Sequence, residues 1–234
     1  MGKLYLGDQE IGVYQMEKAE EPLIKYTVDS NGKISKGGDA FVLPSNVKDL
    51  GPYVFYYACE RGTVTSADLS SLTSISGDHA AYYMFSGCTN LTSVDLSSLV
   101  TITGNSGTCS MFNSCTNLVS ADLSSLATIN GSYAAQVMFN GCTNLTSVDL
   151  SSLSTIIGSS SASGMFQNCK NLREVRFPAL TANSFGTRTN QISDLVYGVT
   201  GCTLHFPAST QAKIEKMSGY PNFGGINTTV LFDL

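Results

Sequence analysis

The sequence predicts a β-rich solenoid, in which similar coils stack and form a parallel β-sheet along one face. Two observations predict this fold class. The first is a 27-residue period, which is shared by phenylalanine, cysteine and aspartate in the columns Phe85, Phe112, Phe139 and Phe166; Cys88, Cys115, Cys142 and Cys169; and Asp68, Asp95, Asp122 and Asp149. A period of this length is typical of repeats that bury their apolar faces only against their neighbours.

The second observation is the alternation of apolar and polar residues within each repeat. In the sequence LTSVDL, Leu91, Val94 and Leu96 are apolar, and Ser93 and Asp95 are polar. Alternation over this stretch predicts a strand whose apolar side chains point into the stack and whose polar side chains face solvent.

The rest of each repeat is expected to lead the chain around the coil. Gly104 opens a turn, and the segment that follows it differs from repeat to repeat, as expected for an exposed convex side. Met111, Phe112 and Cys115 then return to the core. Residues at this spacing share one side of a helix, so a short helical or 3₁₀ turn is expected there.

The period divides the chain into three regions. Residues 1–50 are expected to form a small N-terminal β cap, with strands in KLYLG and IGVYQM and a hairpin at Asn31-Gly32. Residues 51–207 form the solenoid. Residues 208–234 form a C-terminal cap with a short helix, because an exposed sheet edge needs a cover.

The charge distribution argues against a nucleic-acid partner. The net charge is −5, and no Lys or Arg lies between Gly62 and Cys169, a stretch that contains five Asp residues. Binding to phosphates requires a basic stripe, which the repeats lack. No apolar run is long enough for a membrane helix, and the first ten residues do not resemble a secretory signal.

Of the seven cysteines, the four in the repeat column are expected to be buried free thiols, and Cys59, Cys109 and Cys202 lie off the column. Small apolar slots in a stack suit thiols, and parallel side chains in one column are poorly oriented for disulfides, which remain the alternative. One cysteine per coil, without a C-x-x-C pair, also argues against zinc.

The aspartate column is the candidate site. Asp68, Asp95, Asp122 and Asp149 are expected in line on the exposed strand face, beside Ser93, Ser120 and Ser147, and to end at Arg173, Glu174 and Arg176. One interpretation is structural, with the carboxylates hydrogen-bonded to serine hydroxyls and backbone at the strand ends. The alternative is a binding surface for a basic protein patch or, weakly, for calcium; no cofactor is otherwise expected.

The sequence does not support catalysis. Neither His79 nor His205 lies in a motif with a nucleophile and an orienting acid, and no G-x-S-x-G elbow occurs. A uniform aspartate column would also give each carboxylate the same surroundings, whereas acid and base roles need different pKa values.

Tyrosines gather near the start of the solenoid. Tyr53, Tyr56 and Tyr57 precede the first clear repeat and are expected mostly to pack against the N-terminal cap. Tyr82, Tyr83 and Tyr133 lie on variable arcs, where exposed tyrosines are candidate contact residues.

The repeats resemble BspA-like leucine-rich repeats, which occur in bacterial and protist surface proteins. The residues that carry the resemblance are Ile102, Gly104, Phe112, Cys115, Leu118 and Leu123, and the segment FPASTQAKIEKM resembles the family's usual ending. The resemblance implies a leucine-rich-repeat solenoid that recognises or adheres to a protein or glycan, at the cell surface or in the extracellular space. The alternative is a structural or receptor-binding component of a phage particle, since KLYLGDQEIGVY is faintly similar to phage-tail proteins.

Overall fold

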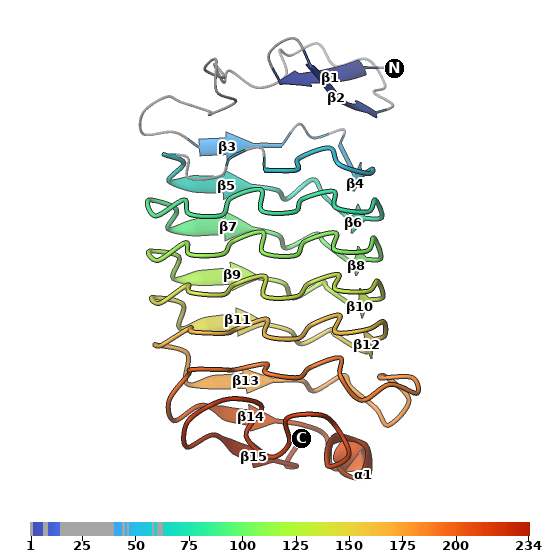
Figure 1. Cartoon of the computed structure of the whole chain (residues 1–234), viewed down its shortest axis with the longest axis vertical. Helices are drawn as coiled ribbons and strands as arrows, with labels where there is room; N and C mark the ends of the chain where they lie inside the picture. The colour runs from blue at the N-terminus through green and yellow to red at the C-terminus, as the bar shows by residue number, and fades with distance from the viewer. Residues whose placement is uncertain are drawn as a thin grey trace.

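The computed structural model describes residues 2–6, 9–14, 40–43, 45, 47–57, 59 and 63–234. From residue 40 onward these residues form one β-solenoid, in which successive coils stack along the long axis of the molecule (Figure 1). The predicted fold class is therefore confirmed. Residues 26–35, which contain the expected Asn31-Gly32 hairpin, lie outside the described residues.

The main parallel sheet forms the strand face of the solenoid. Its order is β3–β5–β7–β9–β11. The strands are β3 (Ala40–Val42), β5 (Ser66–Asp68), β7 (Ser93–Asp95), β9 (Ser120–Asp122) and β11 (Ser147–Asp149). Neighbouring strands pair without a register shift, so each aspartate of the column lies opposite the next.

A second parallel sheet lies around the corner from the first. It consists of two-residue strands in the order β4–β6–β8–β10–β12. Their bounds are β4 (Asp49–Leu50), β6 (Ser74–Ile75), β8 (Thr101–Ile102), β10 (Thr128–Ile129) and β12 (Thr155–Ile156). Because β3 and β4 pair with the coil that follows them, the parallel stack begins at Ala40, ahead of the boundary expected at residue 51.

The two ends of the chain carry different structures. At the N-terminus, β1 (Gly2–Leu6) and β2 (Gln9–Tyr14) pair antiparallel. At the C-terminus, a third parallel sheet runs β13 (Glu174–Arg176), β14 (Thr203–His205) and β15 (Thr229–Leu231). The 3₁₀ turn η1 (Ala208–Thr210) and helix α1 (Gln211–Ile214) lie where the short helix was expected.

The core is a set of columns that run along the stack. Phe85, Phe112, Phe139 and Phe166 are fully buried, and their rings stack face to face with centroids 5.4–5.9 Å apart. Offset stacking at this separation is favourable in addition to the burial itself. The leucine and isoleucine columns fill the remaining interior, so each coil depends on its neighbours for a complete core.

All seven cysteines lie within the described residues, and all are free and buried, which confirms the prediction for the four of the repeat column. The thiols of Cys115, Cys142 and Cys169 each donate a hydrogen bond of 3.1 Å to a phenylalanine carbonyl of the preceding coil. Burial raises the pKa of Cys142 to about 12, so this thiol stays protonated and unreactive.

The turn side of the solenoid, opposite the strands, is more regular than its sequence suggests. In the third coil the N–H groups of Cys109, Met111 and Asn113 bond three residues back, whereas those of Thr108, Ser110 and Phe112 bond to carbonyls of the next coil. Since alternate N–H groups point along the stack, a helix cannot form. Residues 105–114 are accordingly hydrogen-bonded turns where a short helical turn was expected.

Candidate functional site

The aspartates of the column cap the turns that follow the strands. Each Oδ1 accepts a hydrogen bond from the backbone N–H two residues later, at 3.0, 3.0, 2.9 and 2.8 Å along the series Asp68, Asp95, Asp122 and Asp149. This is an Asx turn, which aspartate favours because its short side chain reaches its own backbone. The geometry supports the structural interpretation of the column.

The serines that bond to the carboxylates are those after each aspartate. The hydroxyls of Ser70 and Ser97 donate to Asp68 and Asp95 at 2.6 and 2.7 Å. The hydroxyl and backbone N–H of Ser124 hold the pKa of Asp122 below its usual value. The serines that precede the aspartates, Ser93, Ser120 and Ser147, are exposed at the starts of their strands.

A pocket of about 830 Å³ opens on the strand face where the main sheet ends. It spans β9, β11 and β13, and no β-ladder joins β11 to β13, although both strands lie in the fully described residues 63–234. The central residue of β11, Val148, is half-buried there, whereas its counterparts Ala121 and Val175 are buried. The pocket therefore has a partly apolar base at the point where the strand pairing of the main sheet is interrupted.

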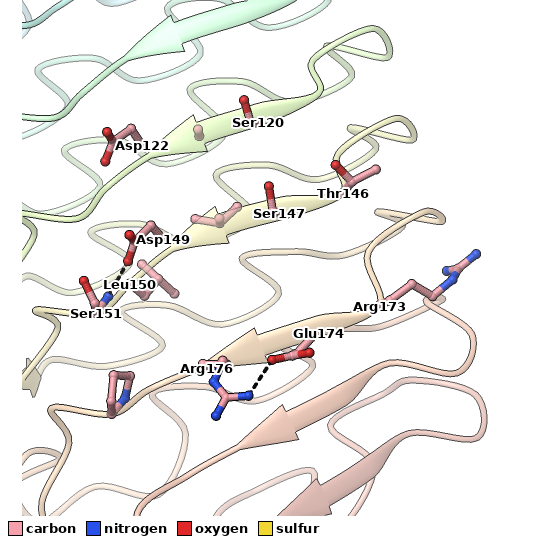
Figure 2. Close-up of a pocket in the computed structure, with 13 residues that line it drawn as sticks. Ser120, Asp122, Thr146, Ser147, Asp149, Leu150, Ser151, Arg173, Glu174 and Arg176 are labelled. Carbon is pink, nitrogen blue, oxygen red and sulfur yellow. Dashed lines mark hydrogen bonds and ion pairs between the residues drawn. The ribbon is translucent and has the colours of Figure 1, made fainter. Parts of the chain in front are cut away.

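The rim of the pocket carries charges of both signs, as Figure 2 shows. Asp122 and Asp149 lie on one side, and Arg173, Glu174 and Arg176 lie on the other. Arg176 donates a 2.8 Å hydrogen bond to Glu174 and holds the pKa of that carboxyl below its usual value. Both side chains are about half exposed, so the pair is accessible to a ligand.

The structure brings most of the predicted site residues together. The pocket lining includes Ser120, Asp122, Ser147, Asp149, Arg173, Glu174 and Arg176. Asp68, Asp95 and Ser93 lie on earlier coils of the same face, outside the pocket.

Sequence reasoning missed the apolar part of the lining, including Val148, Leu150 and Pro178. The departure of NLREVRFPAL from the repeat was the available signal. The spacing from Asp149 to Arg176 is still 27 residues, so the period alone did not reveal the break in the sheet.

Comparison with protein families identifies the repeats. The model of the BspA type leucine rich repeat region matches residues 48–193 with six copies. The chain belongs to this family. The matched residues include every strand of the main sheet after β3. They also include all the residues that line the pocket.

Two solved leucine-rich repeat structures resemble the chain. The leucine-rich repeat protein of T. pallidum is 20% identical, with 88% of this chain and 96% of that chain covered and a TM-score of 0.41. A leucine-rich repeat protein of Bacteroides ovatus is 14% identical, with 91% and 77% covered and a TM-score of 0.37. A search among curated proteins gives no match to the chain.

His205 joins the leucine-rich repeats to the C-terminal cap beside the pocket. Its Nδ1 lies 2.9 Å from Oδ1 of Asp233, and its Nε2 lies 3.8 Å from Oε1 of Glu174. His205 is buried, so these contacts hold β13, β14 and the chain end together.

The described residues hold neither a candidate metal cluster nor a candidate membrane helix. Within them, no three His, Cys, Asp or Glu side chains are grouped so that they could hold a metal ion. Weak binding of calcium by the aspartate column stays a prediction. The described part of the chain contains no helix that could cross a membrane.

Proposed function

We propose that this chain is a non-catalytic recognition module that binds a protein ligand through the pocket between β9, β11 and β13. The observation that carries the proposal is the position of opposite charges around a partly apolar base. Leucine-rich repeats generally serve protein binding, and solenoids present extended surfaces for this purpose. The resemblance to surface proteins supports a role in adhesion at a bacterial cell surface or in the extracellular space.

The charge pattern indicates what a ligand would present. A basic side chain of the ligand fits beside Asp122 and Asp149, and an acidic side chain fits beside Arg173 and Arg176. Complementary charges of this kind increase the association rate and suppress incorrect partners. Because Val148 and Pro178 line the same pocket as the charged side chains, the pocket can also take an apolar side chain of the ligand.

Arrays of extracellular proteins and of glycans, probed with the whole chain, test the proposal. A protein ligand found on the array should bind Asp149→Asn and Arg176→Ala more weakly than wild type, by about tenfold for a truncated contact residue. A ligand found only among the glycans, and bound more weakly by Asp149→Asn and Arg176→Ala, would contradict the choice of a protein.

Asp68→Asn is the matched control. Asp68 caps an Asx turn of its own at 3.0 Å, as Asp149 does at 2.8 Å, but it lies outside the pocket. Equal weakening of binding by Asp68→Asn and Asp149→Asn would place the contact elsewhere and overturn the proposal.

A further inference from the structure

A cluster of six aromatic side chains lies on the turn side of the first two coils. The aromatic cluster consists of Tyr53, Tyr56, Tyr57, His79, Tyr82 and Tyr83. Tyr53, Tyr56 and Tyr57 are 53%, 45% and 37% exposed. Exposed aromatic groups of this size are unusual on a surface without a partner, and they commonly mark a binding site.

The rings form three face-to-face pairs between the two coils. Tyr53 stacks on His79, Tyr56 on Tyr82 and Tyr57 on Tyr83, with centroids 5.2, 5.2 and 4.9 Å apart and ring planes within 10° of parallel. Edge contacts between neighbouring columns, such as Tyr56 to Tyr57 at 4.7 Å, hold the columns together. The cluster is therefore a preorganised array, and its rings lose little freedom when a ligand binds.

Each stacked pair forms a short column of rings, and all three columns end at the second coil. The backbone N–H of Tyr83 bonds to the carbonyl of Cys109, and that of His79 bonds to Asn105, which sets the register with the third coil. In this register Ser106, Cys109 and Ser110 occupy the positions that follow His79, Tyr82 and Tyr83. The last ring of each column is thus followed by a small side chain.

The backbone does not require aromatic residues at these positions. Tyr53, Tyr57, His79 and Tyr83 have positive φ, between 54° and 59°, a conformation that disfavours residues with a Cβ by about 1–2 kcal/mol. The equivalent positions in later coils also have positive φ, and they carry Ser106 and Ser110 in the third coil, Tyr133 and Val137 in the fourth, and Ser160 and Gly164 in the fifth. Since small residues suffice for the turn, the rings are explained better by a ligand than by the fold.

The tyrosines of the aromatic cluster carry no charge at physiological pH. Partial burial raises the pKa of Tyr82 to about 12, so its phenol stays protonated at physiological pH. The nearest acid in sequence, Asp78, accepts a 2.7 Å hydrogen bond from the backbone of Asn105. No Lys or Arg occurs from residue 62 to 169, so the second coil, which carries His79, Tyr82 and Tyr83, supplies no counter-charge for phosphate or sulfate. The chemistry indicates an uncharged ligand.

We propose that the aromatic cluster binds a neutral glycan, with a pyranose ring stacked on Tyr82 and Tyr83 above the small residues of the third coil. A pyranose ring has C–H groups on its faces and hydroxyls around its rim. These features match the phenol faces, which pack against C–H groups, and the phenol hydroxyls, which both donate and accept hydrogen bonds. A proline ring matches only the faces, because a proline-rich peptide offers few donors.

The site is independent of the pocket in the proposed function. It lies on the turn side of the first two coils, whereas the pocket lies on the strand face between the third and fifth long strands of the repeats. A failure of either proposal leaves the other standing.

The test is a glycan array of neutral oligosaccharides probed with the whole chain, followed by calorimetric titration of the strongest binder. Tyr82→Ala and Tyr83→Ala should each weaken binding by about tenfold, the value for loss of a stacking contact of about 1.4 kcal/mol. Tyr82→Phe retains the ring and should weaken binding less. Thermal unfolding of each variant shows that it is folded.

Tyr197→Ala and Asp149→Asn are the controls. Tyr197 is also exposed, but it lies near the C-terminal end of the stack. Both variants should bind the oligosaccharide as wild type does. The proposal is overturned if no neutral oligosaccharide binds, if binding survives both Tyr82→Ala and Tyr83→Ala, or if only a proline-rich peptide binds in a manner that depends on these tyrosines.

Discussion

At the scale of single residues, the repeated aspartate is explained by the turn that it closes. The same Oδ1-to-backbone hydrogen bond occurs after four successive strands, at 2.8–3.0 Å. This repeated turn needs a hydrogen-bond acceptor on the side chain two residues before the N–H group, and both Asp and Asn supply one. At Asp149 the residue also lines the pocket, so one side chain serves both the fold and the proposed site.

Asp122→Asn separates the charge from the hydrogen bond. The amide oxygen still accepts from Ser124, so stability at neutral pH should change by no more than about 0.5 kcal/mol. In wild type the folded pKa of Asp122 is lowered, so its contribution is present above the unfolded pKa of about 3.9 and is lost as the pH falls through the folded pKa. Urea denaturation from pH 7 to pH 3 should therefore show a smaller acid loss in the variant.

Asp122→Ala provides the comparison at neutral pH. Alanine removes the acceptor, and the loss of this exposed hydrogen bond should cost about 1 kcal/mol. If alanine and asparagine were equivalent at neutral pH, the Asx turn would not contribute to stability.

At the scale of structural elements, a glycine column sets how closely the coils approach each other. A Cβ built on Gly131 would lie 2.5 Å from the carbonyl oxygen of Gly104 in the preceding coil, and Gly104 and Gly158 are similarly crowded. Glycine is required at the corner after the second sheet because the backbones touch there. The sequence showed these glycines as turn residues, but only the stack shows what they contact.

Gly131→Ala should destabilise the protein by about 1–3 kcal/mol, the usual range for overpacking a rigid site. Thermal or urea unfolding measures the effect. Gly51→Ala is the matched control, because an added Cβ there meets only a Val54 methyl group at 4.0 Å. Equal losses in the two variants would show that backbone contact between coils is not the cause.

At the scale of the whole molecule, stability is shared between coils that depend on their neighbours. The core columns, the two parallel sheets and the turn-side hydrogen bonds all run along the stack. A solenoid of this kind is approximately a sum of coil terms and interface terms. Among the described strands of the strand face, from β3 to β15, the pairing is interrupted only once, at the pocket.

Deletion of residues 103–129 removes one period of 27 residues and joins Ile102 to Asn130. The shortened chain should fold with an unchanged circular dichroism spectrum per residue and a lower unfolding midpoint, because one coil and one interface are lost. Deletion of residues 103–127 removes 25 residues and displaces the remaining register. It should lower the unfolding midpoint further than the 27-residue deletion does, and an equal or higher midpoint in that variant would contradict a register-dependent core.

The sequence by itself determined the coil, the inward columns, the buried thiols and the line of aspartates, because a repeated side chain at a constant period has one environment. It also indicated that Arg173 to Arg176 end the acidic column. The tertiary structure alone decided that the sheet breaks between β11 and β13 and that Val148 is uncovered there, since strand pairing depends on how the last repeat meets the C-terminal cap. It likewise decided that Tyr56 and Tyr57 stack on Tyr82 and Tyr83, because the register between coils places residues 26 apart face to face.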